Sequence, residues 1–376
     1  MIIGFDGKRA VRNATGLGNY SRLIIDQLSK HYPEHQYRVY SPTPDNHHRM
    51  DEVLKRDNVS LHLPEGNKLE KKLWRSIRGL SAQAKRDGVD ILHGLSAQLP
   101  LDVSKHRLKS VVTVHDLIFC HFPKLYGPFN TAIYKFKCRR ACEMADRIVA
   151  VSECTKRDII KFLNIPAEKI DVVYQGCNPI FSEPVSDDAM QRVQQRYDLP
   201  DRFLLNVGTI EERKNVMLIV KALEHVADKD IHLVVVGRKT KYTTLVEEFA
   251  QQHGLERRVH ILTKVPTLDL PALYHSATAF IYPSRFEGFG IPIIEAQSCG
   301  APVIAATGSC LEEAAGPDAL FVNPDSTEQM TEAIDTIVSD ESLRQKLIEK
   351  GYENVKRFAP ETIARNMMNV YQEVMK

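Results

Sequence analysis

Two carboxylates, Glu287 and Glu295, stand with seven residues between them around a turn that contains Gly288 and Gly290. A short apolar run at 279–282 precedes this turn, and an apolar helical pattern follows it. A strand–turn–helix order places backbone amides and the positive end of a helix at the turn, where glycine lets a ligand approach closely. Amides, a positive helix end and two carboxylates together suit a ligand that carries both phosphate and hydroxyls, as a nucleotide sugar does.

Two further stretches in the second half of the chain place phosphate-binding groups after strands. Arg213 and Lys214 follow the expected strand 203–207, where they would neutralise a diphosphate and stabilise it as a leaving group. A solvated charge cluster is the alternative. Residues 308–312, GSCLE, also follow a strand; their small side chains and amides suit phosphate, and Glu312 would contact a ribose. Helix capping is the alternative for this segment.

In the first half, His115 and Asp116 follow the apolar strand 110–114. The carboxyl ends of strands are where ligands bind in open α/β sheets. His115 would therefore donate a hydrogen bond to a sugar hydroxyl or steady developing charge. A structural histidine that caps the strand is the alternative.

Gly16 and Gly18 come after the first strand and a loop over residues 6–15, and they open a helix. At this position a glycine turn brings backbone amides to a phosphate, and a plain tight turn is the alternative. The third glycine position of a dinucleotide-binding fingerprint holds Ser21, and no acidic residue ends a well-placed second strand. A dehydrogenase is therefore not favoured.

Residues 68–86 have the pattern of a basic amphipathic helix beside Trp74, the single tryptophan of the chain. Its cations are Lys68, Lys71, Lys72, Arg75 and Arg78. We favour a solvated face over a packed stripe for this helix, and peripheral contact with an anionic membrane is the alternative.

Strands alternate with helices along both halves of the chain, which predicts an α/β fold with parallel sheets. The expected strands cover residues 1–5, 37–40, 59–63, 89–93, 110–114, 147–151 and 169–174, and then 203–207, 231–236, 259–262, 279–282, 302–305 and 320–322. The pattern lapses over 175–199, and residues 327–376 read as helical with a break at 358–360. We expect two Rossmann-like domains, with helices on both faces of each sheet, facing a cleft.

The composition excludes several classes of protein. A chain of 376 residues exceeds one ordinary hydrophobic core, and a net charge of +2 argues against a nucleic-acid binder. The seven cysteines include no CxxC pair, so we expect reduced thiols and no metal site. The first residues, MIIGFDGKRA, lack the pattern of a secretion signal, and no apolar run approaches the roughly 20 residues that cross a bilayer. We therefore expect a cytoplasmic protein, with contact to the cytoplasmic face of a membrane as the alternative noted above.

Taken together, these segments resemble the GT-B glycosyltransferases of retaining family 4, and mannosyltransferase-like members in particular. The most specific part is EGFG-x-P-x-x-EA from Glu287, followed by CGAPVIA from Cys299. TGLGNY, VHDL, VSE and GTIEERKN occur in the order that the family has them. The resemblance implies an acceptor-side domain over 1–178, a nucleotide-sugar-binding domain over 179–360, and a C-terminal helix, 361–376, that crosses back to the first domain.

The resemblance also implies a role for each matching residue. Glu287 would contact hydroxyls of the donor sugar, Glu295 the ribose, and Lys214 the diphosphate. Many members have an arginine where this chain has Thr209, so Arg213 is its expected substitute. The residues expected to take part in catalysis are His115, Glu287, Lys214 and Arg213. Those expected to bind the donor are Gly16, Gly18, Thr209, Gly288, Phe289, Gly290, Ile291, Glu295 and Glu312.

The activity that follows is retaining, metal-independent transfer of a hexose, mannose from GDP-mannose, to a hydroxyl of a glycan or lipid-linked acceptor in cell-surface polysaccharide synthesis. No cofactor beyond the nucleotide sugar is expected. On this reading Glu287→Ala abolishes transfer and leaves the fold intact. A nucleotide-sugar epimerase of the same architecture, or a non-catalytic partner that binds a nucleotide sugar, are the alternatives.

Overall fold

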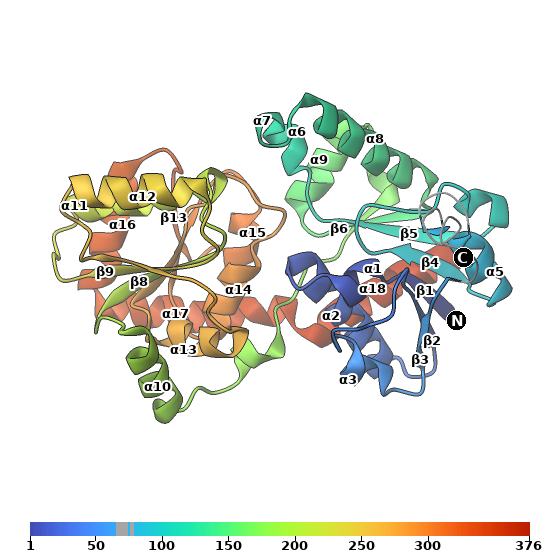
Figure 1. Cartoon of the computed structure of the whole chain (residues 1–376), viewed down its shortest axis with the longest axis horizontal. Coiled ribbons are helices and arrows are strands. Elements are labelled where there is room, and N and C mark those ends of the chain that lie inside the picture. The colour runs from blue at the N-terminus through green and yellow to red at the C-terminus, as the bar shows by residue number, and fades with distance from the viewer. Residues whose placement is uncertain (65–73, 76–78) are drawn as a thin grey trace. The chain divides into compact units, whose positions relative to one another are not determined.

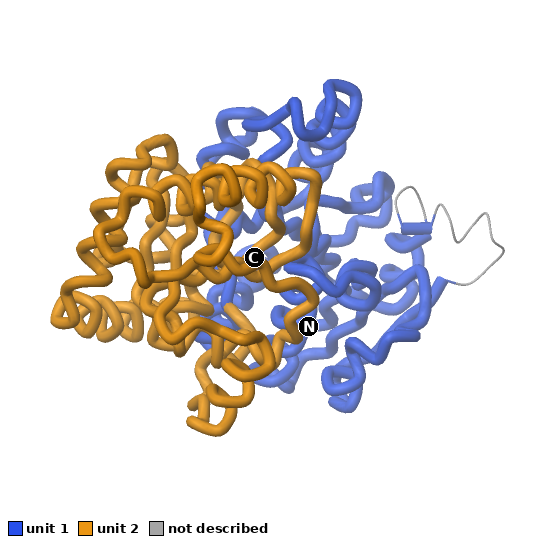
Figure 2. The backbone as a smooth tube through the Cα atoms, turned by 60° about the vertical axis from the view of Figure 1, so that its left-hand side comes forward, with its two compact units in different colours: residues 1–176, 359–376 blue, residues 177–358 orange. Residues whose placement is uncertain are grey.

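The computed structural model describes residues 1–64, 74–75 and 79–376 and divides the chain into two compact units (Figure 2). Unit 1 comprises Met1–Gly176 and Ala359–Lys376, and unit 2 comprises Cys177–Phe358. No helix among the described residues is both long and apolar enough to cross a membrane.

Within the described residues, unit 1 holds a seven-stranded parallel sheet in the order β3-β2-β1-β4-β5-β6-β7. Its strands are β1 (Ile2–Asp6), β2 (Gln36–Tyr40), β3 (Val59–His62), β4 (Ile91–Gly94), β5 (Lys109–Val114), β6 (Arg147–Ala150) and β7 (Ile170–Val172). Its helices are α1 (Lys8–Arg12), α2 (Gly16–His31), α3 (Asp51–Leu54), α5 (Leu80–Arg86), α6 (Ile118–His121), α7 (Pro123–Tyr126), α8 (Pro128–Met144), α9 (Glu153–Leu163) and α18 (Pro360–Met375), with 3₁₀ turns at Val103–His106 and Ala167–Lys169.

Unit 2, all of whose residues are described, holds a six-stranded parallel sheet in the order β10-β9-β8-β11-β12-β13. Its strands are β8 (Phe203–Val207), β9 (His232–Val236), β10 (Val259–Leu262), β11 (Ala279–Tyr282), β12 (Val303–Ala306) and β13 (Leu320–Val322). Its helices are α10 (Asp187–Tyr197), α11 (Val216–His225), α12 (Lys241–Gln252), α13 (Leu270–Ser276), α14 (Ile291–Ser298), α15 (Leu311–Ala315), α16 (Thr327–Ser339) and α17 (Glu341–Val355), with 3₁₀ turns at Pro179–Ser182, Glu212–Lys214, Thr267–Asp269 and Lys356–Phe358.

Each sheet is doubly wound, with helices on both of its faces (Figure 1). Strands β9, β11 and β12 are short and almost wholly buried, as the continuous apolar runs predicted, because a parallel sheet is covered on both sides. In both sheets the first strand of the unit pairs with the second and the fourth, so the connections leave toward opposite faces at that point. This topological switch point is where open α/β sheets bind ligands.

Helix α18, although last in the chain, packs in unit 1 against α2 and β5. Its buried side chains, among them Met367 and Tyr371, belong to one apolar cluster with Ile24 and Ile25 of α2 and with β1. The apolar stripe of α18 therefore completes the core on one face of the first sheet.

Two local expectations were wrong. The loop over 6–15 contains helix α1, which the sequence did not reveal because one and a half turns are too short for a recognisable apolar period. Residues 68–86 do not form one continuous helix, because Gly79 has φ 116°, outside the helical region, and α5 begins after it. Most of the expected basic face, Lys68, Lys71, Lys72 and Arg78, lies outside the described residues.

The described members of that basic segment are engaged within unit 1. Trp74 is buried and its indole N–H donates to Gln83 Oε1 at 3.0 Å. Arg75 Nε lies 2.7 Å from Asp6 Oδ2, an ion pair between two largely buried side chains at the end of β1. These contacts favour a packed role for the tryptophan and for Arg75.

Candidate functional site in unit 2

The expected donor-binding residues of unit 2 converge at the carboxyl edge of the second sheet. Gly208 and Thr209 follow β8, the turn 283–290 follows β11, and the turn 307–310 follows β12. Because β8 and β11 are neighbours at the switch point, the first two turns lie side by side. A direct bond joins them, from the amide of Arg285 to the carbonyl of Arg213 at 2.9 Å.

Glu287 is the centre of this site. Arg213 Nη1 lies 2.8 Å and Lys214 Nζ 2.6 Å from its Oε1 atom. Ser284 Oγ donates to the same oxygen at 2.6 Å, and the hydroxyl of Tyr282 lies 3.4 Å from it. All four groups thus approach the same carboxylate oxygen, Oε1 of Glu287.

The charged groups of this cluster shift one another's pKa values. Burial alone would raise the pKa of Glu287, but the positive charges of Lys214 and Arg213 and the hydrogen bonds from Lys214 and Ser284 outweigh it and lower the pKa. Glu287 is therefore ionised at neutral pH. Burial raises the pKa of Tyr282 well above its usual range, and the charge of Glu287 raises it further, so this hydroxyl stays protonated.

The two cations differ in the number of protein groups that they already contact. Arg213 also pairs with Glu211 at 2.7 Å and donates to the carbonyl of Phe286. Lys214 donates to the hydroxyl of Tyr282 and has Glu287 as its acidic partner among the described residues. Arg213 is thus held on three sides, whereas Lys214 is the cation with more capacity for a ligand anion.

The turn that carries Glu287 is fixed by groups from other segments. Asn215, at φ 59°, donates its side-chain amide to the carbonyls of Pro283 and Pro324 at 3.2 and 2.8 Å. The thiol of Cys310 donates to the carbonyls of Glu287 and Phe289 at 3.1 and 2.9 Å. These bonds tie the turn to the segments that contain residues 215 and 310.

Gly290 and Ile291 begin helix α14. Gly290 has φ 120°, and a Cβ there would lie 3.1 Å from Leu311 and 3.3 Å from Ala314, so only glycine fits without strain. Helix α14 has no side-chain cap at its N-terminus, which leaves the positive end of its dipole facing the turn. Phe289 is buried against Phe358 and contributes backbone to this region, and Gly288 is half-buried.

Glu295 lies one turn into α14 and is half-buried. The hydroxyl of Tyr274 donates to its Oε2 at 2.9 Å. Burial raises the pKa of Glu295 to about 7, although the bond from Tyr274 lowers it. The charges of Glu287 and Glu295 both raise the pKa of Tyr282, so the two carboxylates lie around the same hydroxyl. The pKa of Glu287 is lowered, whereas that of Glu295 is raised.

The turn after β12 has two features that bear on phosphate binding. Glu312 Oε2 accepts from the amide of Gly308 at 3.1 Å, so the exposed Glu312 carboxylate bonds to its own turn. The hydroxyl of Ser309 is buried and has no hydrogen-bond partner among the described residues. An unsatisfied buried hydroxyl is costly, so this hydroxyl has capacity for one more hydrogen bond.

Among the described residues, no group of three or more His, Cys, Asp or Glu side chains is arranged to hold a metal ion. Positive charge in this site is supplied by Arg213, Lys214 and the α14 N-terminus.

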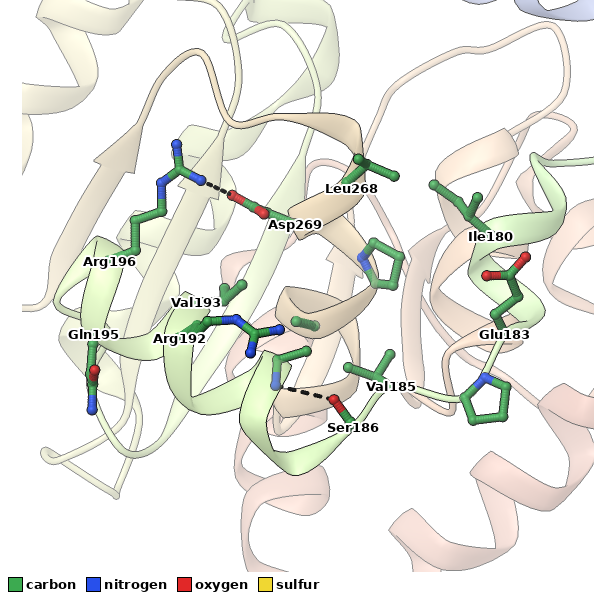
Figure 3. A pocket seen from close by; sticks show the side chains of 14 residues that line it. Ile180, Glu183, Val185, Ser186, Arg192, Val193, Gln195, Arg196, Leu268 and Asp269 are labelled. Carbon is green, nitrogen blue, oxygen red and sulfur yellow. Dashed lines mark hydrogen bonds and ion pairs between the residues drawn. The ribbon is translucent and has the colours of Figure 1, made fainter.

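A separate groove of about 830 Å³ lies between the 3₁₀ turn Pro179–Ser182, α10 and the start of α13 (Figure 3). None of the residues singled out in the sequence lines it. Asp269 accepts bonds from Arg196 at 3.0 Å and from Tyr197 at 2.6 Å, which tie α10 to the turn before α13. The groove is therefore distinct from the patch around Glu287.

The expected residues of unit 1 lie at the carboxyl edge of the first sheet. Gly16 and Gly18 form the first turn of α2 instead of a separate glycine turn, because the helix begins at Gly16. A Cβ on Gly18 would lie 1.9 Å from the carbonyl oxygen of Asn13, so the close approach of residue 13 requires glycine. Gly16 has open space around it.

His115 follows β5 and is buried. Its Nε2 donates to the carbonyl of Leu95 at 2.9 Å, which fixes the tautomer, and its Nδ1 accepts from the amide of Gln175 at 3.2 Å. Burial lowers the pKa of His115 to about 4, against the bond to Leu95 that raises it, and the charge of Arg9 lowers it further. The imidazole is therefore neutral, with both nitrogens already bonded within unit 1.

A chain of buried polar contacts runs from α18 to His115. His93 lies between Tyr371 and Thr113, with its ring nitrogens 2.7 and 2.9 Å from their hydroxyls. The hydroxyl of Tyr20 lies 3.1 Å from Thr113, and its ring meets that of His115 edge-on at 4.5 Å. The C-terminal helix thus contributes to the position of His115.

Several residues of the site were missed in the sequence. Tyr274, Tyr282 and Ser284 bond to the two carboxylates, and Gln175 bonds to His115. The tyrosines lie in apolar runs that read as core. A tyrosine as the last residue of a strand, directly before a functional turn, is the available signal.

Comparisons with known proteins agree with this architecture. Residues 14–180 match the family model "Glycosyltransferase Family 4", and residues 187–354 match "Glycosyl transferases group 1". The chain is 27% identical to O-antigen chain mannosyltransferase B of Escherichia coli, over 95% of this chain and 96% of that one. Sucrose-phosphate synthase of Thermosynechococcus elongatus superposes with a TM-score of 0.79 at 20% identity, over 100% and 99% of the two chains.

Anabaena HepE, solved in complex with UDP and glucose, superposes with a TM-score of 0.76 at 18% identity, over 99% of each chain. The two family models together cover both units, and these structural neighbours share the fold. The chain therefore belongs to the GT-B glycosyltransferases of family 4 and is a transferase.

Proposed function

We propose that this glycosyltransferase moves mannose from GDP-mannose to a hydroxyl of a glycan or lipid-linked acceptor, with retention and without a metal, in the cytoplasmic synthesis of a cell-surface polysaccharide. The choice of mannose rests on the near full-length similarity to an O-antigen mannosyltransferase. The choice of a nucleotide donor is consistent with the UDP and glucose complex of HepE, which shares the fold.

The observation that carries the proposal is the cluster of Arg213 and Lys214 on Glu287 at the switch point of the second sheet. Two cations share one carboxylate, so the three side chains together carry a charge of +1 next to the positive end of α14. Such a preorganised site stabilises a departing diphosphate without a divalent cation. The second oxygen of Glu287 then accepts from sugar hydroxyls, and Glu295, in its ionised form, accepts from the ribose.

The decisive experiment is a panel of nucleotide sugars tested by thermal shift, because binding to the native state raises the unfolding midpoint. We expect GDP-mannose to raise the midpoint more than GDP-glucose, UDP-glucose or UDP-galactose. Mass spectrometry of a glycan acceptor incubated with GDP-mannose then detects transfer, with EDTA present in a parallel sample. A larger shift with a UDP-sugar would reject the donor assignment, and loss of transfer in EDTA would reject metal independence.

The two alternatives are separated by incubating the donor without an acceptor. An epimerase changes the stereochemistry of the donor sugar, which NMR detects, whereas a transferase leaves it unchanged apart from slow hydrolysis. A non-catalytic partner binds the donor or fails to bind any nucleotide sugar, and in neither case does it modify an acceptor.

A further inference from the structure

Tyr282 is the last residue of β11, and it is 2% exposed. Its hydroxyl accepts a hydrogen bond from Nζ of Lys214 and lies 3.4 Å from Oε1 of Glu287. The same ammonium group lies 4.9 Å from the centroid of the Tyr282 ring, which is within the range of a cation–π contact. Tyr282 therefore contacts Lys214 with both its hydroxyl and its ring.

The ring of Tyr282 is packed in the core of unit 2. It stacks on the ring of Phe280, with the two centroids 5.7 Å apart and an interplanar angle of 23°. The two side chains point to the same face of β11, since residues two apart in a strand share a face. Close packing of a buried ring restricts its movement, and this restriction fixes the place of the hydroxyl beside the Glu287 turn.

The N–H groups of Lys214 can be counted. An ammonium group has three N–H groups and no acceptor. Among the described residues, two atoms accept from them, namely Oε1 of Glu287 at 2.6 Å and the hydroxyl oxygen of Tyr282. One N–H of Lys214 is thus left for a ligand, and the two protein contacts decide where it points.

The hydroxyl of Tyr282 adds direction to this site without adding charge. Burial and the charge of Glu287 raise the pKa of Tyr282 well above its usual range, so the hydroxyl is neutral. Phenylalanine at this position would keep the ring beside Lys214 and would leave every charge of the site in place. It would remove only the oxygen that accepts from the ammonium group, which would then have Glu287 as its one anchor and could turn about it.

We propose that Tyr282 is a positioning residue for transfer, which acts through Lys214 by aiming the third N–H of the ammonium group at the diphosphate of the nucleotide sugar. This inference rests on the proposed function, in which Lys214 stabilises the departing diphosphate. A group that is aimed in advance acts most on the charge that develops in the transition state. Loss of the Tyr282 hydroxyl should therefore lower kcat more than it weakens binding of the nucleotide sugar.

A double-mutant cycle tests whether Tyr282 acts through Lys214. Transfer rates are measured for the wild type, Tyr282→Phe, Lys214→Ala and the double variant, with the nucleotide sugar that gives the largest thermal shift. We expect Tyr282→Phe to lower kcat about tenfold and to raise KM about threefold at most. In the Lys214→Ala background the same change should alter neither, because the ammonium group that it orients is absent. A role in folding alone would give equal factors in both backgrounds.

Lys214→Arg separates direction from charge and does not alter Tyr282. A guanidinium group keeps the positive charge, but its planar fork of N–H groups cannot reproduce the three directions of an ammonium group. We therefore expect kcat of Lys214→Arg to stay at least about tenfold below that of the wild type.

Calorimetric titration with inorganic pyrophosphate repeats the cycle without a sugar or a base. We expect Lys214→Ala to lower the affinity at least about tenfold, Tyr282→Phe to lower it about threefold, and the double variant to match Lys214→Ala. The matched control is Tyr37→Phe, which removes another buried tyrosine hydroxyl, one that donates to backbone carbonyls of unit 1. We expect this control to bind pyrophosphate and to transfer like the wild type. Unfolding midpoints show that each variant is folded.

Four results would overturn the proposal. The first is a Tyr282→Phe protein whose kcat and pyrophosphate affinity equal those of the wild type. The second is an equal loss in the Lys214→Ala background, which would make Tyr282 independent of Lys214. The third is a Lys214→Arg protein with the kcat of the wild type, and the fourth is a wild type that binds no pyrophosphate. If the pyrophosphate cycle gives the expected result but no nucleotide sugar is transferred, the proposed function fails and the orientation of Lys214 by Tyr282 is supported.

Discussion

The ammonium group of Lys214 lies 2.6 Å from Oε1 of Glu287, and the two side chains are only 15% and 11% exposed. Arg213 reaches the same oxygen from the other side. A carboxylate in this position does two things: it holds two cations in a fixed geometry, and it depends on them for its own charge. The role of Glu287 in binding and its role in stability are therefore coupled, which changes how its variants should be chosen.

Glu287→Ala would leave two nearly buried cations without their carboxylate, so the expectation of an intact fold does not suit this variant. Breaking a buried ion pair from one side costs about 3–5 kcal/mol. Glu287→Gln keeps the shape and an oxygen acceptor, so we expect a smaller loss of stability with transfer lowered by about 10²-fold or more. Urea unfolding and initial transfer rates of both variants check this. Equal stability of Glu287→Ala and wild type would contradict the coupling.

We expect substitution of Lys214 to affect mainly catalysis, and substitution of Arg213 to affect stability as well. Lys214→Ala removes the cation with more free capacity, so we expect kcat/KM to fall by about 10²–10³-fold with a modest change in the unfolding midpoint. Arg213→Ala removes the arginine partner of Glu211, one donor to the Phe286 carbonyl and one of the two cations on Glu287, so we expect a loss of about 2–4 kcal/mol of stability as well. A stable Arg213→Ala protein with a larger catalytic defect than Lys214→Ala would reverse the assignment.

Ser309→Ala tests whether the turn after β12 contacts the donor. The buried Ser309 hydroxyl has no partner in the described part of the chain, so its removal should leave stability unchanged or slightly raised. If the hydroxyl bonds to the donor, donor affinity should fall about 5–20-fold, the equivalent of one hydrogen bond. Calorimetric titration with the donor measures the change. Unchanged affinity would assign the hydroxyl no contact with the ligand.

Much of the fold was predictable because the strands are continuous apolar runs bounded by turn residues. Each strand in the described residues overlaps an expected one, and β8, β10, β11 and β13 have the expected bounds. The differences lie at strand ends. Val89 was expected in a strand, but its amide bonds to Ala84 and closes helix α5, so pairing begins with Asp90 and Ile91.

The candidate site was predictable in its residue types but only partly in its contacts. Arg213, Lys214 and Glu287 could be named from their positions after strands, whereas their mutual pairing depends on side-chain directions that no spacing encodes. The buried bonds of His115 to Leu95 and Gln175 are likewise invisible in the sequence, because they join three distant segments. The roles of these residues toward a donor remain predictions.

The raised pKa of Glu295 predicts that the free energy of unfolding depends on pH. Its pKa is raised by burial from 4.5 to about 7, so the folded state binds this proton more tightly than the unfolded state. Its stabilising contribution is complete below pH 4.5 and is lost as pH rises from there to about 7, by up to about 3 kcal/mol. Glu295→Gln should abolish this fall, which urea unfolding across the range measures.

A control variant strengthens the Glu295 test. Tyr274→Phe removes the hydrogen bond that lowers the pKa of Glu295, so the fall should extend to higher pH. Donor affinity should rise with pH through about 7, because the ionised carboxylate accepts ribose hydroxyls better than the protonated one. If the free energy of unfolding changed with pH in the same way in the wild type and in Glu295→Gln, this would contradict the raised pKa.

His115 and His93 predict the opposite behaviour in acid. Burial lowers their pKa values to about 4 and about 3, so the folded state favours the neutral rings. Their contribution to stability is complete above the ordinary pKa of 6.5 and is lost as pH falls toward 4 and 3. The two rings together should give the free energy of unfolding a slope of about 2.7 kcal/mol per pH unit between pH 6 and 4, since each proton contributes about 1.4.

Urea unfolding of two variants tests this slope. His115→Asn should halve it, whereas His47→Asn, at an exposed position, should leave it unchanged. A wild-type slope that His115→Asn does not alter would show that folding does not change the pKa of this ring.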